Sequence, residues 1–292
     1  MLVTLAVSSL GSVLTATILG RRLQKIVADA VKQVEQDANE RLAQELALQS
    51  YYSGGTRLHR RNADDLMLGS GKAIASEIGG CFEGIREVGR GIVYFGSARF
   101  EPGTPLYEKA KDLARRLAAT LQCPSWSGGG KGIMGAVTHG AKAAGQKVGA
   151  VRISREASDV PGKAPPGKNP LHDTTVFCQF MASRKIGLTD AGMRVQESDK
   201  TAVVVMPGGI GTLDEAMEIL VLGQLNKMGT NYPVPVLLVN YDSFYDGILN
   251  WLESAEKAGA LSRKELSSLK VVSTNDEAVE YLAKFYGVAP KP

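Results

Sequence analysis

Cysteine and histidine are scarce in this sequence, and neither forms a metal-binding pattern. The three cysteines, Cys81, Cys123 and Cys178, are odd in number and show no CxxC spacing. We interpret them as free thiols in a reducing compartment, which favours a cytoplasmic protein. The three histidines have no metal-ligand spacing. We therefore expect no structural metal.

A strong net charge is also missing. The formal charge of +4 over 292 residues is too small to indicate a nucleic-acid partner. The length suits one large α/β domain with an extension. Glycine, in contrast, is abundant. It accounts for 33 of the 292 residues, or about 11%, whereas its typical share is about 7%. Much of the excess falls in turns between predicted strands and helices, which is typical of nucleotide-binding α/β folds.

The N-terminus lacks the basic start of a secretory signal. Residues 1–20 carry no charge and end at a pair of arginines. A membrane-anchoring or interfacial helix, an organelle transit peptide, and an ordinary helix or tail all stay open. Residues 21–60 predict a long amphipathic helix over Arg21–Gln49 and a linker. We therefore place the α/β domain at residues 61–292.

Strands and helices alternate from residue 64 onward, without an internal repeat. This order predicts a doubly wound, mainly parallel sheet covered on both faces, with an N-terminal helical extension. A loop over Ser154–Pro170, rich in proline, is a candidate lid. The predicted strands are Gly91–Phe95, Pro124–Ser127, Lys147–Ile153, Thr174–Phe180, Ala202–Met206, Val236–Val239 and Leu269–Val272. The predicted helices are Asp64–Val88, Thr104–Leu121, Ala136–Ala144, Met181 to about Val195, one from Thr212, Ser243–Ala258, Ser262–Leu269 and Asp276–Tyr286.

The stretch Lys200–Leu222 combines a buried strand, a glycine turn and a helix start. Glycines let backbone N–H groups approach an anion, and a helix N-terminus supplies unpaired donors and a partial positive charge. The stretch therefore predicts a phosphate site. Glu215 lies one turn into the helix, so a carboxylate stands beside the proposed anion. That arrangement favours chemistry on a phosphorylated sugar.

Two further glycine turns follow predicted strands, one at Gly96-Ser97 and one at Gly128–Gly132, which includes Gly129 and Gly130. Ligands of open α/β sheets bind at the carboxyl ends of the strands, so these turns are candidates for contacts with phosphate and ribose. The second turn lacks the GxxxxGK[ST] spacing of a Walker A loop. It also lacks a GxGxxG with an acidic partner, so a dinucleotide is not favoured.

Glu215 has two interpretations at this point. Thr212 and Glu215 match a capping box, in which both side chains satisfy helix-end donors. Alternatively, the carboxylate stabilises positive charge at an anomeric carbon during glycoside cleavage. Arg184 and Lys185 stand near a predicted helix start, where the macrodipole disfavours cations, so a phosphate or a carboxylate should hold them. Arg184 would then bind phosphate or orient Glu215.

Two motifs, MASRK at Met181–Lys185 and PGGIGTLDE at Pro207–Glu215, resemble the paired signatures of the Lonely-guy (LOG) family of cytokinin riboside 5′-monophosphate phosphoribohydrolases. The resemblance covers roughly Gly91–Tyr286. It implies a Rossmann-like fold, a homodimer and no cofactor. It also implies hydrolysis of a nucleoside 5′-monophosphate to free base and ribose 5-phosphate, with Arg184 and Glu215 as catalytic residues. The positions that match the family's substrate-binding residues are Lys185, Gly208, Gly209, Ile210, Gly211, Thr212, Leu213 and Asp214.

The turn GGGKGIMG is one residue shorter than in plant-type members of that family. The resemblance therefore leaves the base open between a cytokinin and an AMP-like nucleotide. No lysine has a pyridoxal-phosphate context, so we reject the decarboxylase label sometimes attached to the family. The alternatives are a non-catalytic nucleotide or cofactor carrier on the same fold, and a membrane-tethered scaffold acting through residues 1–50.

Overall fold

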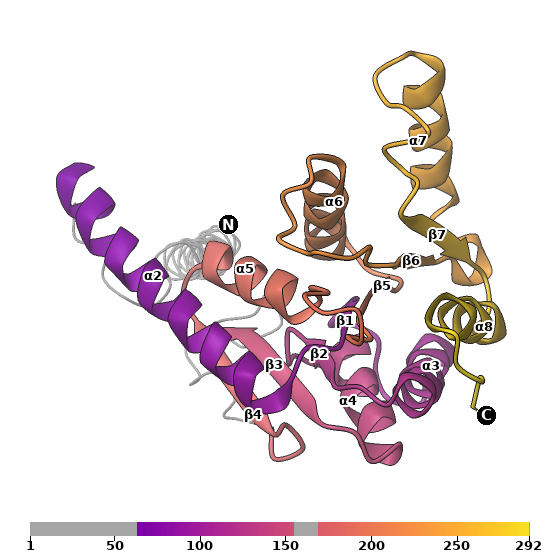
Figure 1. Cartoon of the computed structure of the whole chain (residues 1–292), viewed down its shortest axis with the longest axis horizontal. Coiled ribbons are helices and arrows are strands. Elements are labelled where there is room, and N and C mark those ends of the chain that lie inside the picture. The colour runs from indigo at the N-terminus through magenta and orange to yellow at the C-terminus, as the bar shows by residue number, and fades with distance from the viewer. Residues whose placement is uncertain (1–62, 155–168, 292) are drawn as a thin grey trace, which may run out of the picture. The chain divides into compact units, whose positions relative to one another are not determined.

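Seven parallel strands form the central sheet of the protein (Figure 1). The computed structural model describes residues 63–154 and 169–291. All seven predicted strands are confirmed, each to within two residues of its predicted ends. The strands are β1 (Ile92–Phe95), β2 (Ser125–Ser127), β3 (Val148–Ile153), β4 (Thr174–Cys178), β5 (Ala202–Val205), β6 (Val236–Val239) and β7 (Leu269–Val272).

The strand order is β4-β3-β2-β1-β5-β6-β7, so the chain reverses direction across the sheet between β4 and β5. It first builds outward from β1 through β2 and β3 to β4. It then returns to pair β5 with the free side of β1, with Ile92 opposite Ala202. The strands β1, β5 and β6 are buried along their whole length, as expected for apolar runs in a parallel sheet. The predicted doubly wound α/β fold is confirmed, and its topological switch point lies between β1 and β5.

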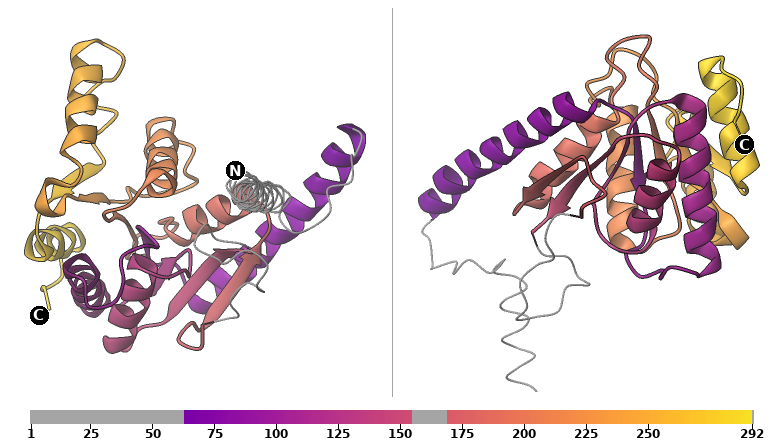
Figure 2. Two further views of the ribbon diagram at one scale, coloured as in Figure 1. Left: turned by 180° about the vertical axis from the view of Figure 1, so that it is seen from behind. Right: turned by 90° about the horizontal axis from the view of Figure 1, so that it is seen from below.

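Two layers of helices cover the sheet, one on each face (Figures 1 and 2). On one face, Leu113, Val137 and Leu282 join one hydrophobic core. On the other, Ile85 and Leu188 join a second core. The first layer consists of α3 (Pro105–Leu121), α4 (Ile133–Ala143) and α8 (Asn275–Tyr286), and the second of α2 (Ala63–Val88), α5 (Met181–Ala191), α6 (Ile210–Gln224) and α7 (Asp246–Lys257).

Several predicted helix ends are wrong by three residues or more. The helix α4 begins at Ile133 rather than Ala136, because the Ile133 N–H is held by the Ser97 carbonyl at 2.9 Å and Gly132 makes the entry turn at φ 63°. The helix α5 ends at Ala191 rather than Val195. The Gly192 N–H there bonds the Thr189 carbonyl at 3.1 Å, which tightens and closes the last turn.

The predicted start of α7 and the predicted helix Ser262–Leu269 are also wrong. A short 3₁₀ turn, η1 (Tyr241–Ser243), precedes α7, and left-handed backbone at Asp242 and Ser243 delays the helix to Asp246. The segment Ser262–Leu269 forms successive turns closed by bonds from residue i+3 to residue i, and its last residue already belongs to β7. Bonds of that spacing do not build an α-helix.

The predicted N-terminal segments 1–20 and 21–60 lie outside the described residues, as does the predicted lid Ser154–Pro170 apart from its ends. Among the helices of the described part, none is long and apolar enough to span a membrane.

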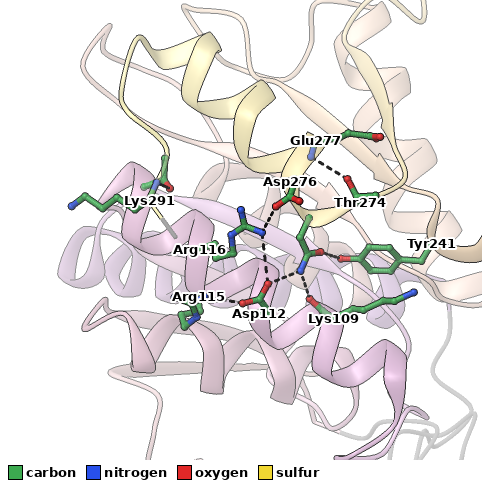
Figure 3. A network of polar contacts seen from close by, with 11 residues as sticks. Lys109, Asp112, Arg115, Arg116, Tyr241, Thr274, Asp276, Glu277 and Lys291 are labelled. Carbon is green, nitrogen blue, oxygen red and sulfur yellow. Dashed lines mark hydrogen bonds and ion pairs between the residues drawn. The ribbon is translucent and has the colours of Figure 1, made fainter.

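A polar network ties α8 to α3 and to the turn after β6 (Figure 3). The Asn275 amide donates to the Asp112 carboxylate at 2.8 Å, and its oxygen accepts from the Tyr241 hydroxyl. Arg116 pairs with Asp276 at 2.7 Å. Because Tyr241 opens the turn that leads to the cavity described below, the network anchors one wall of that cavity.

Candidate active site

The three glycine turns meet at the carboxyl edge of the sheet, because β2, β1 and β5 are neighbours. Backbone hydrogen bonds join the turns directly. The Met206 N–H donates to the Phe95 carbonyl at 2.8 Å, and the Ser97 N–H donates to the Pro207 carbonyl at 3.1 Å. The Ser97 carbonyl in turn accepts from Ile133. The turns therefore form one backbone cradle at the switch point.

A cavity of about 560 Å³ opens over this cradle. Its lining includes Arg184 and Glu215 together with residues of all three glycine turns. The turn residues are Gly96, Ser97, Gly128, Gly208, Gly209, Ile210, Gly211 and Thr212.

Arg184 and Glu215 form an ion pair that faces this cavity. Arg184 Nη2 lies 3.3 Å from Glu215 Oε1, and each side chain is only 9% exposed. The Arg184 Nε also donates to the Val151 carbonyl of β3 at 3.3 Å. The predicted carboxylate partner of this cation near a helix start is thus Glu215. Removing either member of so buried a pair would leave the other charge poorly solvated.

Gly128 makes the room that the Arg184 guanidinium occupies. A Cβ atom at Gly128 would lie 2.1 Å from Arg184 Nη2 and 2.9 Å from Met134 Sδ. Real Cβ atoms do not approach so closely, so any side chain at this position would displace the arginine. Within the predicted turn Gly128–Gly132, the residue next to the arginine is therefore the first glycine.

The capping-box interpretation of Thr212 and Glu215 is wrong. Helix α6 begins at Ile210, with Gly209 at the N-cap and no side-chain cap, so Thr212 is already inside the first turn. Thr212 packs tightly over Gly208, where a Cβ atom would lie 2.2 Å from Thr212 Oγ1. Gly209 at the N-cap and the first-turn residues Ile210, Gly211 and Thr212 line the cavity, so the helix start borders the space in which an anion would bind.

Several predicted binding residues lie outside the cavity lining, namely Gly129, Gly130, Lys185, Leu213 and Asp214. Lys185 Nζ instead pairs with Asp214 at 3.1 Å and with Glu218 at 2.7 Å. Leu213 packs against the hydrophobic core under α6. Gly129 adopts a left-handed φ of 68° and approaches the buried His172 ring.

Several apolar side chains of the cavity lining are not among the predicted site residues. Phe100 follows the first turn, Met134 lies at the start of α4, and Phe244 comes from the turn after β6. Arg99 adds a second cation to the lining. A local signal existed only for Met134, which belongs to the glycine-rich motif. Phe244 reaches the site because of strand order, which the local sequence does not encode.

Tyr245 anchors the glycine turn that follows β5. Its hydroxyl donates to the Met206 carbonyl at 2.7 Å. Burial raises the pKa of Tyr245, so the hydroxyl remains a neutral donor at physiological pH.

All three cysteines are free, as predicted, and the structure buries each of them. No group of three or more His, Cys, Asp or Glu side chains that could hold a metal ion occurs in residues 63–154 and 169–291.

Comparison with known families identifies the chain. The family model described as "Possible lysine decarboxylase" matches residues 134–282, slightly more than half of the chain, including both Arg184 and Glu215. The protein belongs to this family, the LOG family. The LOG-family chain is 28% identical over 195 residues to a cytokinin riboside 5′-monophosphate phosphoribohydrolase of Mycobacterium marinum, covering 65% of this chain and 91% of the relative.

A rice relative named probable cytokinin riboside 5′-monophosphate phosphoribohydrolase LOGL3 is 27% identical over 197 residues, covering 67% of this LOG-family chain and 84% of the relative. Among solved structures, the chain is similar to the molybdenum cofactor carrier protein of Chlamydomonas reinhardtii. That match has 18% identity and a TM-score of 0.43, covering 67% of this chain and 99% of the carrier.

Proposed function

We propose that this LOG-family protein hydrolyses the N-glycosidic bond of a nucleoside 5′-monophosphate, giving free base and ribose 5-phosphate. The observation that carries the proposal is the buried Arg184–Glu215 pair, which faces the same cavity as the uncapped start of α6. A phosphate site and a carboxylate within one cavity are what this reaction requires. The names of the curated relatives support the same reaction class.

In the proposed mechanism, the N–H groups at the start of α6 bind the 5′-phosphate. The Glu215 carboxylate stabilises the positive charge that develops at C1′ as the bond to the base nitrogen breaks. Arg184 positions that carboxylate. Water forms the new C1′–O bond, and its proton ends on the departing base.

The base would occupy the apolar part of the cavity. Phe100, Met181 and Phe244 line this part and offer flat or flexible apolar contact to a ring. Cytokinin riboside monophosphates and AMP-like nucleotides are the two substrate candidates.

The test measures, by chromatography, the release of free base from AMP and from isopentenyladenosine monophosphate. We expect Glu215→Ala to reduce kcat by about 100-fold or more, whereas the exposed Glu280→Ala on α8 serves as the matched control and retains wild-type activity. Full activity in Glu215→Ala would show that the catalytic assignment is wrong. Tight nucleotide binding by the wild type without release of base would instead favour the carrier alternative.

The homodimer and the cytoplasmic location also stay predictions. Light scattering on the purified protein would measure the first, and fractionation of cells expressing the chain with and without residues 1–20 would measure the second and any membrane association.

A further inference from the structure

A second ion-pair cluster joins α5 to α6 immediately outside the candidate active site. Lys185 follows Arg184 in α5, and Asp214 precedes Glu215 in α6. Lys185 Nζ lies 3.1 Å from Asp214 Oδ1 and 2.7 Å from Glu218 Oε2. Adjacent residues of one helix thus pair with adjacent residues of the other, one pair inside the cavity and one outside it.

The Lys185 ammonium is committed to these carboxylates. It has three donors, and it bonds both Asp214 oxygens, at 3.1 and 3.2 Å, as well as Glu218. Lys185 and Asp214 are absent from the cavity lining, in contrast to their sequence neighbours. In this arrangement the three Lys185 donors are used by carboxylates of α6.

Contacts of this kind act together with packing on a shared hydrophobic core to set the position of α5 relative to α6. Helix α5 follows the edge strand β4, whereas α6 follows β5 on the far side of β1. Neither helix directly continues the other, so chain connectivity does not set their separation. The Arg184–Glu215 distance of 3.3 Å is already longer than the roughly 2.7–2.9 Å of a strong charge-assisted hydrogen bond. A small shift between the helices would therefore break it.

We propose that Lys185 is a positioning residue, which clamps α5 to α6 through Asp214 and Glu218 and so holds Arg184 against Glu215, rather than a ligand of the nucleotide. This inference rests on the proposed hydrolysis, since its effect is read in that reaction. It replaces the nucleotide-binding role that the family resemblance implies for Lys185 and Asp214.

The test is a charge exchange across the clamp. Lys185→Glu alone puts three carboxylates together and should drive the helices apart. Adding Asp214→Lys and Glu218→Lys restores opposite charges across the clamp, now with the negative charge on α5 and the positive charges on α6. Because an exposed ion pair contributes at most about 1 kcal/mol, we expect Lys185→Ala to lower kcat by roughly fivefold. For Lys185→Glu we expect about tenfold or more, with KM changed less than about twofold.

The triple variant should recover most of the lost kcat, because it rebuilds the clamp without a cation at position 185. Lys257→Glu is the matched control, since Lys257 forms an exposed pair within α7 at 3.0 Å from Glu253; it should leave kcat and KM unchanged. Thermal unfolding of each variant verifies that it is folded.

Two outcomes would overturn the inference. One is a rise in KM with kcat unchanged in Lys185→Ala, which would make Lys185 a nucleotide ligand. The other is a triple variant no more active than Lys185→Glu. A wild-type protein that releases no base would refute the proposed function itself, and the inference with it. An active wild type with either of the first two results refutes the clamp alone.

Discussion

Replacing Gly128 with alanine would test whether the space beside this glycine is needed to position Arg184, as distinct from being needed for folding. The added Cβ atom would lie 2.1 Å from Arg184 Nη2, whereas an ordinary non-bonded separation is about 3.5 Å. The guanidinium must therefore retreat by more than about 1 Å, and its 3.3 Å contact with Glu215 is lost. A displacement of that size in a catalytic group costs about 100-fold in rate, so we expect kcat for base release to fall by about that factor.

The fold should tolerate the same substitution. Gly128 has no positive φ, so alanine fits its backbone, and the obstructing atom is the end of a flexible side chain. The lost buried ion pair lowers stability, whereas a Gly-to-Ala replacement at a compatible position contributes about 0.4–1 kcal/mol through the unfolded chain. We therefore expect the melting temperature to fall by several degrees, with the chain still folded at the assay temperature. Gly135→Ala in α4 is the matched control, because the nearest atoms lie 3.8 Å from its added Cβ.

The assay is base release measured together with thermal unfolding. Activity near that of the wild type in Gly128→Ala would refute the assigned contact between Gly128 and Arg184. A collapse in melting temperature of similar severity to the loss of rate would refute the claim that the effect is local to the arginine.

Three further predictions concern the scaffold of the site. Gly149→Ala would place a Cβ atom 2.4 Å from the Trp126 ring, and we expect a loss of about 1–3 kcal/mol in urea unfolding; an unchanged midpoint would contradict this packing. Tyr245→Phe removes the hydrogen bond to Met206 and should cost about 1–3 kcal/mol, measured by thermal unfolding, with no loss if the bond does not form in solution. Burial raises the pKa of Cys123 from 9.0 to about 12, so the unfolded chain loses the thiol proton at lower pH than the folded chain does. The free energy of unfolding therefore falls between about pH 9 and 12. Cys123→Ala should reduce this fall when unfolding by urea is measured across that pH range, and the same pH dependence in the variant would contradict the prediction.

The sequence by itself determined the strands and the edge at which the site lies. Short β-branched runs such as Ala202–Val205 predict buried parallel strands from local composition alone. Glycines directly after such runs mark the carboxyl edge, because parallel strands end together. The two motifs containing Arg184 and Glu215 likewise identified the family, since each is a short contiguous pattern. These features depend on neighbours in the chain, and neighbours are what a sequence displays.

Only the tertiary structure decided which residues face the cavity. Lys185 and Arg184 are adjacent in the sequence, yet one points outward to Asp214 and the other inward to Glu215. Phe244 reaches the site because it lies in the turn after β6, and β6 pairs with β5. The strand order brings together side chains from β1, β2 and β5 turns, and no local pattern specifies that order. Whether Glu215 caps a helix or meets an arginine is therefore a matter of packing between distant segments, which the sequence alone left undecided.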